Sequence, residues 1–436
     1  MRLTYPFQIE RLGAVRIFGL QRVFELESGP TNGVGDSALS WGTTVCHVPA
    51  SALESVQRRM AIVVPCKNER LRLLEGVLCG IPHECLLVFV SNSDREPVDR
   101  FAIERDTIER FCRFNQRTGI VVHQRDPVVG EALAGAGLPE VVDSSGAIRH
   151  GKGEAMMLGI AIARLADRDL VGFVDADNYV PGSVTEYVNA FAADFQLANT
   201  PYSMVRINWR SKPKVVDGAL FFSRFGRASE STDRYLNLFL SNLTGFGTEA
   251  IRTGNAGEHA MSMDLALDLH FATGFAVEPF ELIEIFERFG GLASESGESE
   301  RTVMRAGVDV FQVETQNPHF HEDKGDIHVA EMRHVALAGI HRSALCPSSL
   351  RAEIEDSIRR EGDCPTTALS TVTSYPPLSV LDWERLSAEL RRGTGSLEEF
   401  TYPNMKGIVP AQTSSSRRTP VISGNARRTG RVKPAG

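Results

Sequence analysis

This 436-residue chain has an ordinary globular composition, with 42% hydrophobic and 23% charged residues and a formal net charge of −8. Two or three domains are expected for that length. No apolar run approaches the ~20 residues of a membrane-spanning helix, and the N-terminus lacks the basic and apolar regions of a signal peptide. Seven cysteines without a Cys-x-x-Cys pair favour reduced thiols over a disulfide framework. We therefore expect a cytoplasmic protein with no membrane partner.

The charge is unevenly distributed along the chain. Residues 405–436 contain seven Lys or Arg and no Asp or Glu, which leaves 40 basic residues against 55 acidic ones, a charge near −15, in the body. An acidic body argues against nucleic acid as a partner. The basic tail is rich in Ser, Thr, Pro and Gly and cannot bury a core, so we expect it to be disordered.

The first half of the chain alternates strands with helices, the pattern of a parallel sheet covered by helices. Residues 1–58 are Gly-rich and weakly periodic, and an edge element or hairpin is expected there. Short apolar runs predict strands at 61–64, 86–90, 119–123 and 170–174. Apolar residues at helical spacing predict helices after Asn68, the expected N-cap, and at 97–114 and 152–166. Residues 126–150 contain Gly and Pro and are expected to form an insertion.

The second half, residues 201–340, is more mixed. Strands are predicted at 203–209, 218–222 and 308–314, and helices at 230–242, 257–270 and 279–289. Residues 341–404 are expected to add a helical segment. The whole pattern predicts an α/β fold, a mixed sheet with helices on both faces and C-terminal helical additions.

Asp175 and Asp177 follow the predicted strand 170–174 at its carboxyl end. Two carboxylates one residue apart can share a hard divalent cation, and Mg²⁺ held by one or two carboxylates grips a diphosphate in many proteins. Ligands of open α/β sheets bind beyond the carboxyl ends of strands. The alternative is a surface turn rich in Asp and Asn.

Two further segments lie at the same predicted edge of the sheet. Residues 65–69, Pro65, Cys66, Lys67, Asn68 and Glu69, end the first strand with donors and acceptors that suit a nucleoside; the alternative is a helix cap with Glu in the first turn. Gly151-Lys152-Gly153-Glu154 opens a helix, where the helix N-terminus and Lys152 attract phosphate. It lacks the spacing of a P-loop, and the alternative is a loop with an exposed lysine.

Three segments of the second half complete the candidate site. His319 and His321 alternate after a strand, so only one can join the carboxylates around a metal. In residues 253–260, the amides near Ala256 and Gly257 and the Glu258 carboxylate could bind a phosphate or sugar. A basic cluster in the acidic body suits an anionic second substrate, although a solvated loop is an alternative for each member: Arg206, Arg210, Lys212, Lys214, Arg224 and Arg227.

Together these motifs resemble the mannosyl-3-phosphoglycerate synthase family. The likeness runs in order over roughly residues 1–340 and rests on residues 63–70, 151–154, 173–179, 212–214, 255–260 and 317–322. It implies a GT-A glycosyltransferase that moves mannose from GDP-mannose to 3-phosphoglycerate with retention of configuration, giving the precursor of the compatible solute mannosylglycerate. Residues 59–200 would be its nucleotide-sugar-binding half and 201–340 its acceptor-binding half.

The resemblance also implies roles for residues. Asp175, Asp177 and His319 would hold Mg²⁺ or Mn²⁺, and Lys152 would face the donor phosphates and act in catalysis with the two aspartates. Residues 65–69, with Lys152 and Asp175-Ala176-Asp177, would bind the nucleotide sugar. The basic cluster and the loop, independently of the resemblance, predict that the sugar and the acceptor are bound by Arg206, Lys212, Arg224, Asn255, Ala256, Gly257, Glu258 and His259. A homodimer is compatible with the sequence.

Other classes of protein share parts of this pattern. A glucosyl-3-phosphoglycerate synthase, using GDP-glucose or UDP-glucose, has the same acceptor and differs by one hydroxyl of the sugar. A haloacid dehalogenase phosphatase also uses Asp-x-Asp after a strand, but near the start of its domain, whereas Asp175 follows three predicted strands. A binding module without catalysis is the third alternative, and a turnover assay separates it from an enzyme.

Overall fold

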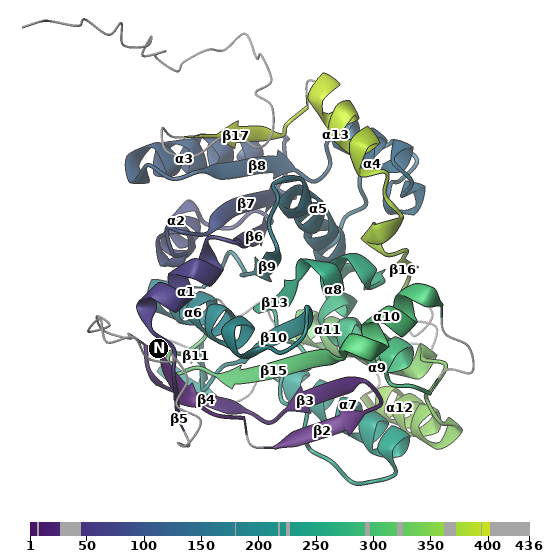
Figure 1. Cartoon of the computed structure of the whole chain (residues 1–436). Helices are drawn as coiled ribbons and strands as arrows, with labels where there is room; N and C mark the ends of the chain where they lie inside the picture. Colours follow the sequence, from purple (N-terminus) through teal and green to yellow (C-terminus); the bar gives the residue numbers. More distant parts are fainter. Residues whose placement is uncertain are drawn as a thin grey trace, which may run out of the picture.

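A computed structural model describes residues 1–6, 8–26, 45–178, 180–216, 219–223, 227–292, 297–320, 326–361, 372–393 and 395–401. In this part of the chain one large sheet runs through the molecule, with the strand order β17-β8-β7-β6-β9-β13-β10-β15-β4-β1-β5. Helices lie on both sides of it (Figure 1). The α/β class and the mixed sheet are therefore confirmed. The predicted basic tail, residues 405–436, lies outside the described residues.

The four strands predicted in the first half are present and parallel: β6 (Met60–Cys66), β7 (Leu86–Ser91), β8 (Gly119–His123) and β9 (Leu170–Phe173). Their helices are α2 (Leu71–Gly80), α3 (Arg100–Asn115), α5 (Lys152–Leu165) and α6 (Pro181–Leu197). Because the strands are parallel, their carboxyl ends meet at one edge of the sheet, which is where a ligand site is expected.

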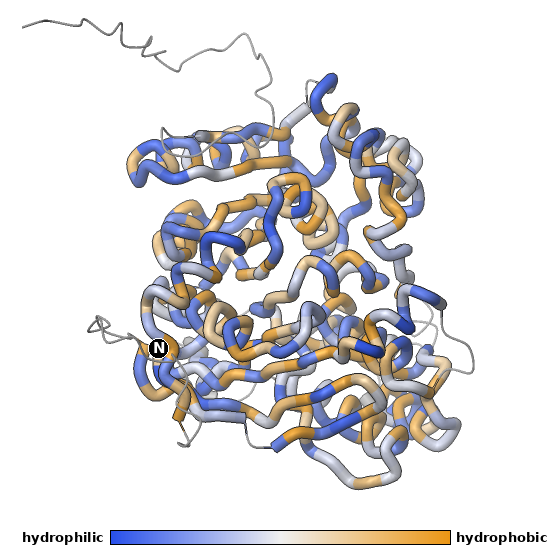
Figure 2. Tube along the Cα trace, viewed as in Figure 1, coloured by the Kyte–Doolittle hydropathy of each residue, from blue (hydrophilic) through white to orange (hydrophobic). Residues whose placement is uncertain are grey.

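The two faces of the sheet bury separate hydrophobic cores. In β6, Ala61 and Val63 pack with α5 on one face, while Ile62 and Val64 pack with α2 and α6 on the other. Side chains alternate between faces along a strand, so a strand covered on both sides is apolar throughout. This explains why short apolar runs predicted these strands correctly. The central strands carry long hydrophobic stretches in Figure 2.

The N-terminal segment forms the far edge of the sheet. β2 (Ile9–Leu12) and β3 (Val15–Phe18) make an antiparallel hairpin. The remaining elements of this segment are β1 (Arg2–Thr4), β4 (Gln21–Glu25), β5 (Val45–His47) and α1 (Ala50–Gln57).

The second half contributes β10 (Tyr202–Asn208) and β15 (Val308–Glu314), which are parallel. Between β9 and β10 lies β13 (His259–Ser262), antiparallel to both. The helix predicted over 257–270 is therefore wrong in its first part, and only α8 (Met263–Asp268) is helical. Other elements here are β11 (Lys212–Val216), β12 (Ala219–Ser223), α7 (Arg227–Thr244), α9 (Val277–Phe289) and α10 (Glu298–Ala306).

Two further expectations are corrected. The insertion 126–150 contains α4 (Pro127–Gly135), which Asp126 caps by accepting from the Val128 backbone N–H. Asn68 is not a helix cap: it has a φ of 56°, and the N-cap of α2 is Arg70. Asn tolerates this left-handed conformation better than most residues.

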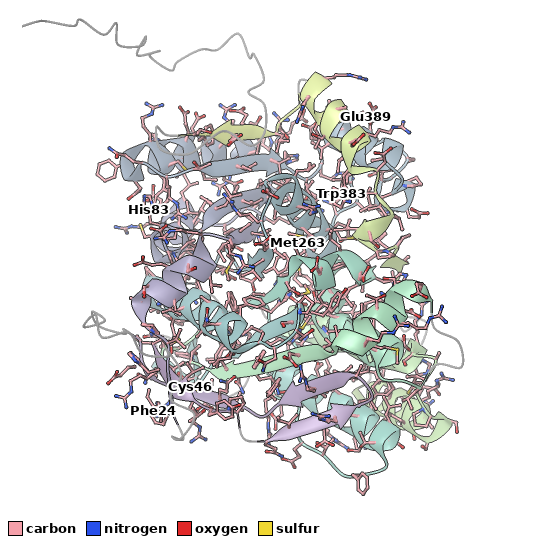
Figure 3. All side chains as sticks on the ribbon, viewed as in Figure 1. Phe24, Cys46, His83, Met263, Trp383 and Glu389 are labelled. Atoms are coloured by element: carbon pink, nitrogen blue, oxygen red, sulfur yellow. The ribbon has the colours of Figure 1, made fainter. Side chains whose placement is uncertain are left out.

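The C-terminal segment is helical in part but also adds strands. Its helices are α11 (Asp326–Arg342), α12 (Ser348–Glu361) and α13 (Trp383–Arg392). β17 (Glu398–Phe400) pairs antiparallel with β8, and β16 (Ser374–Tyr375) pairs with β14 (Phe271–Ala272). Figure 3 shows Glu389 and Trp383 on the outlying helix α13 and Met263 within the interior.

Two sequence expectations on composition can be compared with the described residues. Their cysteines, Cys46, Cys66, Cys79, Cys85, Cys112 and Cys346, are all free thiols. In the same residues no helix combines the length and the apolar character that crossing a membrane requires.

Candidate active site

Asp175, just after β9, and Lys152, at the start of α5, lie together at the edge of the sheet. Lys152, the first residue of α5, places Nζ 2.6 Å from Asp175 Oδ1 and 2.8 Å from Glu278 Oε1. Burial alone would lower the pKa of the Lys152 ammonium, but the two carboxylates outweigh it and the net shift is upward. Burial would likewise raise the pKa of Asp175, and the Lys152 charge holds it below its usual range. The result is a fixed positive charge beside the first aspartate of the Asp-x-Asp motif.

The loop of residues 253–258 packs directly against this cluster. A Cβ atom on Gly257 would lie 2.6 Å from Asp175 Oδ2 and 3.2 Å from Lys152 Nζ. Only glycine allows the backbone to approach the two charged groups so closely. The loop that the sequence assigned to the sugar and acceptor therefore lies against the lysine that it assigned to the nucleotide sugar.

Buried side chains hold this loop from beneath. Arg206 donates to the backbone oxygens of Thr253 and Gly254 and pairs with Glu281 at 3.0 Å. The Asp233 carboxylate accepts from the Gly254 N–H at 2.6 Å, and His259 Nδ1 lies 2.9 Å from the Ala256 oxygen. Arg206 and His259 are fully buried. We proposed both from the sequence as ligand-binding residues, but the structure places them as supports of the loop, away from its surface.

Several polar atoms around the cluster have no hydrogen-bond partner within the described part of the chain. They are both side-chain atoms of the Asn255 amide, Oε1 of Glu258 and Oε2 of Glu278. All three side chains are buried. A buried polar group without a partner is costly in free energy, so such a concentration is typical of a place where a polar ligand binds.

An aromatic side chain links Glu258 to His319. Trp209 donates from Nε1 to Glu258 Oε2 at 2.9 Å and stacks on the His319 ring with centroids 4.4 Å apart. His319 Nδ1 lies 3.6 Å from Glu258 Oε1. Burial, aided by the charge of Asp175, raises the pKa of the Glu258 carboxyl to about 8. Lys212 lies over the Trp209 ring, with its Nζ 4.5 Å from the ring centre.

The segment before His319 is fixed by Glu186 of α6. Its carboxylate accepts from the backbone N–H groups of Gln316 and Asn317, at 2.6 and 2.9 Å, and from the Asn317 side chain. Asn178 Nδ2 approaches His319 Nδ1 at 3.4 Å. His319 therefore lies beside the turn that follows the Asp-x-Asp motif, whereas His321, its alternative, lies outside the described residues, as does Arg224.

Residues 65–69 form the last two positions of β6 and the turn after it, and the polar groups of Cys66 and Asn68 are bonded to residues 93, 94 and 104. Asn68 exchanges hydrogen bonds with Asp94, at 2.9 and 3.0 Å, and its N–H donates to Ser93 Oγ at 2.7 Å. Cys66 is buried beside Glu104, a buried carboxylate that also accepts from Ser91 and Ser93. Cys66 therefore supports the edge, whereas Lys67 is exposed.

The side chains of the described residues form no three-ligand metal centre as they stand. Within the described ranges, no three His, Cys, Asp or Glu side chains are grouped so that they could hold a metal ion. Asp175 is one of the three predicted metal ligands, and its carboxylate is paired with the Lys152 ammonium.

Four site residues were missed from the sequence: Glu278, Trp209, Glu186 and Glu104. A signal existed for Glu278, since a Glu-Pro pair in the first turn of a helix marks a helix start at which a carboxylate is favourable. Glu104 and Glu186 lie inside amphipathic helices, where a buried carboxylate cannot be told from a solvated one.

Comparisons with known proteins agree with one family over most of the chain. The family model described as mannosyl-3-phosphoglycerate synthase matches residues 5–390. A mannosyl-3-phosphoglycerate synthase of Pyrococcus furiosus is 43% identical over 370 residues, covering 84% of this chain and 92% of that protein. One of Aeropyrum pernix is 39% identical over 362 residues, covering 83% of this chain and 90% of that protein.

Solved structures of glucosyl-3-phosphoglycerate synthase from Mycobacterium tuberculosis are more distant. The complex with phosphoglyceric acid gives a TM-score of 0.47 at 20% identity and covers 75% of this chain and 94% of that one. The complex with Mn²⁺, UDP-glucose and glycerol 3-phosphate gives 0.49 at 20% identity, with 78% and 98% covered.

Proposed function

The chain belongs to the mannosyl-3-phosphoglycerate synthase family, and we propose that it transfers mannose from GDP-mannose to 3-phosphoglycerate with retention of configuration. The observation that carries this proposal is the Lys152–Asp175–Glu278 cluster, packed against a loop in which Asn255 and Glu258 have buried atoms without a hydrogen-bond partner among the described residues. A sugar diphosphate needs both parts: positive charge for its phosphates and hydrogen-bonding groups for its hydroxyls.

Lys152 supports the leaving-group side of this reaction. Its ammonium is nearly buried, with 11% of the side chain exposed, and a charge in such surroundings stabilises negative charge more strongly than it would in water. As the bond between the anomeric carbon and the diphosphate breaks, the charge that develops on the phosphate oxygens would lie beside Lys152. Asp175 would keep the lysine charged and aimed.

The donor set at the Asp-x-Asp turn suits Mg²⁺ or Mn²⁺, held by two protein side chains and the substrate. Asp177 would supply oxygen, and His319 would supply Nε2, because Nδ1 faces Glu258 and Asn178. Mg²⁺ is commonly bound by one or two side chains plus substrate phosphates, so the absence of a third ligand is compatible with it. When bound, the metal would neutralise the diphosphate.

The acceptor would bind on the side of Lys212. This lysine lies over Trp209 and near Glu258, and 3-phosphoglycerate carries two anionic groups that cations would hold. Arg224 stays a proposed partner from the sequence. Asn255 and Glu258 would bind hydroxyls of the mannose between the two substrates.

We propose front-face attack as the route to retention. The single hydroxyl of 3-phosphoglycerate would form the new bond to the anomeric carbon on the side from which the diphosphate leaves. Its proton would pass to a diphosphate oxygen, so no protein base is required. Lys152 would stabilise the departing anion, and the metal would take the rest of its charge.

A matrix of donors and acceptors tests this function. GDP-mannose, GDP-glucose and UDP-glucose are each assayed against 3-phosphoglycerate and glycerate, with and without Mg²⁺ or Mn²⁺. We expect turnover of GDP-mannose with 3-phosphoglycerate alone, dependent on the metal, and an α-linked product by NMR. A preference for UDP-glucose would identify a glucosyltransferase, and no turnover of any pair would contradict the proposal.

A further inference from the structure

We propose that Tyr375 and Glu154 form a clamp that positions Lys152 for its contact with the donor diphosphate. The inference rests on the proposed function and adds two positioning residues to it, one of them from the C-terminal segment. Tyr375 lies 221 residues away from Glu154 along the chain, and it belongs to neither half of the predicted nucleotide-sugar site.

The clamp consists of two hydrogen bonds to one buried carboxylate. The Tyr375 hydroxyl donates to Glu154 Oε1 at 2.7 Å, and the Gly274 backbone N–H donates to Glu154 Oε2 at 3.1 Å. Each of the two side chains is only 1% exposed. Burial raises the pKa of Glu154, and these donors oppose that rise. Both oxygens of the carboxylate are therefore directed at fixed partners.

Strand pairing brings the tyrosine to this place. β16 pairs with β14 so that Tyr375 lies opposite Phe271, and the Thr273 N–H donates to the Thr373 oxygen at 2.9 Å. The start of α5 packs on the same strand, since a Cβ atom on Gly153 would lie 2.1 Å from the Ala272 oxygen. The first turn of α5 is thus held against residues 271–274 without room for a side chain between them.

Lys152 and Glu154 both connect the start of α5 with residues 274–278, but α5 supplies the donor in one contact and the acceptor in the other. Lys152 donates from the start of α5 to Glu278 at the start of α9, whereas Glu154 accepts from Gly274, four residues before Glu278. Two crossed bonds fix the relative position of the two helix starts. Because Lys152 and Glu154 share the first turn of α5, a shift of Glu154 moves the lysine as well.

A merely structural tie for the C-terminal segment would use the same hydrogen bond, but it would behave differently in a double-mutant cycle. If Tyr375 acts through Lys152, its removal should matter for GDP binding only while the lysine is present. If it only stabilises the fold, its effect should be the same with and without the lysine.

The experiment measures GDP binding in the presence of Mg²⁺ by calorimetry, with Tm alongside, for Tyr375→Phe, Lys152→Gln and the double variant. We expect Tyr375→Phe to weaken GDP binding about tenfold and to have no further effect on binding in the Lys152→Gln background, while it lowers Tm in both. Glu154→Gln should bind GDP like the wild type, because its amide can donate to the Tyr375 oxygen and still accept from Gly274.

Tyr202→Phe is the matched control. Tyr202 lies at the start of β10, and no hydrogen bond of its hydroxyl is found within the described residues, so GDP binding should be unchanged. Equal effects of Tyr375→Phe in the two backgrounds, or no effect in either, would overturn the clamp. Failure of the wild type itself to bind GDP would overturn the proposed function, and the clamp with it.

Discussion

The two sides of the site differ in how their polar groups are satisfied. At the strand-end side, the polar groups of residues 66–68 and 91–94 are bonded to one another or to Glu104 of α3: Asn68 pairs with Asp94, and Glu104 accepts from Ser91, Ser93 and Cys66. At the loop side, residues 253–258, the backbone is held from beneath, but Asn255 and Glu258 keep atoms without a hydrogen-bond partner among the described residues.

This difference indicates that the strand-end side is a rigid frame of the site and that the loop side is its ligand surface. Networks that are fully satisfied rigidify a structure and offer little to a ligand, whereas unpartnered buried groups gain the most from one. We infer that the strand-end side contributes mainly shape and backbone groups to nucleotide binding. The loop side and the Lys152 cluster would then provide the specific contacts to the sugar and phosphates.

The largest effect is expected from a change at Asp177, the proposed metal ligand. Asp177→Asn removes the anionic oxygen proposed for Mg²⁺, so kcat should fall by at least about a thousandfold while the fold is kept. Steady-state rates across a Mg²⁺ titration, with circular dichroism, measure this. Asp169→Asn, in an exposed pair with Arg59 at the other end of β9, is the control and should retain activity. A rate near that of the wild type in Asp177→Asn would show that this turn holds no catalytic metal.

The second effect concerns the support of the loop. Arg206→Met removes a fully buried cation from Glu281 and from two backbone oxygens of the loop. Breaking a buried pair typically costs about 3–5 kcal/mol, so denaturant unfolding should show a large loss of stability, with both Michaelis constants raised. If instead only the acceptor's Michaelis constant rose, at unchanged stability, Arg206 would be the ligand-binding residue that the sequence suggested.

The frame was largely predictable from the sequence, and the reasons are local. Parallel strands buried on both faces give apolar runs, and polar residues directly after them mark the strand ends. Asp126-Pro127 even carried the cap and first-turn proline of α4, although the segment was expected to be an insertion. This reasoning proposed Asp175 and Asp177 as ligands, and the glycine-flanked helix start proposed Lys152.

The support of the site was not predictable, because it depends on contacts between distant segments. Arg206 lies in an apolar strand and is paired in the interior with Glu281, which is 75 residues away in the sequence. Because this distant partner could not be foreseen, the charge of Arg206 suggested a contact with a ligand. The short sequence of residues 259–262, His-Ala-Met-Ser, fits a helix as well as the strand β13 that it forms. Tyr375 gives no local signal for its bond to Glu154.

The third effect tests whether an unpartnered group marks the ligand surface. Asn255→Ala removes a buried amide that lacks hydrogen bonds to the described residues, so Tm should stay the same or rise slightly. If the amide binds a sugar hydroxyl, kcat/KM for GDP-mannose should fall about tenfold, the typical cost of one lost hydrogen bond to a ligand. A loss of stability without a loss of activity would show that Asn255 belongs to the frame instead.

The smallest effect comes from an unpartnered group outside the site. Asp194 is fully buried near the C-terminal end of α6, and neither of its oxygens has a hydrogen-bond partner in the described structure. Burial raises the pKa of its carboxyl well above the usual range, an effect that the neighbouring Gln21 side chain opposes. The folded protein therefore retains a proton that the unfolded chain loses above about pH 4.

Because the folded state then binds more protons than the unfolded state, stability must fall as the pH rises from about 4 toward the raised pKa. Asp194→Asn abolishes this dependence, since the amide is neutral at every pH and can donate to Gln21. We expect the variant to gain about 1 kcal/mol or more at pH 7, to gain nothing near pH 4, and to keep wild-type kcat. Thermal unfolding at a series of pH values measures this, with Asp169→Asn as the exposed control. A gain in stability that did not depend on pH would mean that Asp194 is ionised in the folded protein. A loss of activity would mean that the ligand surface includes Asp194, although no contact with the site is found there.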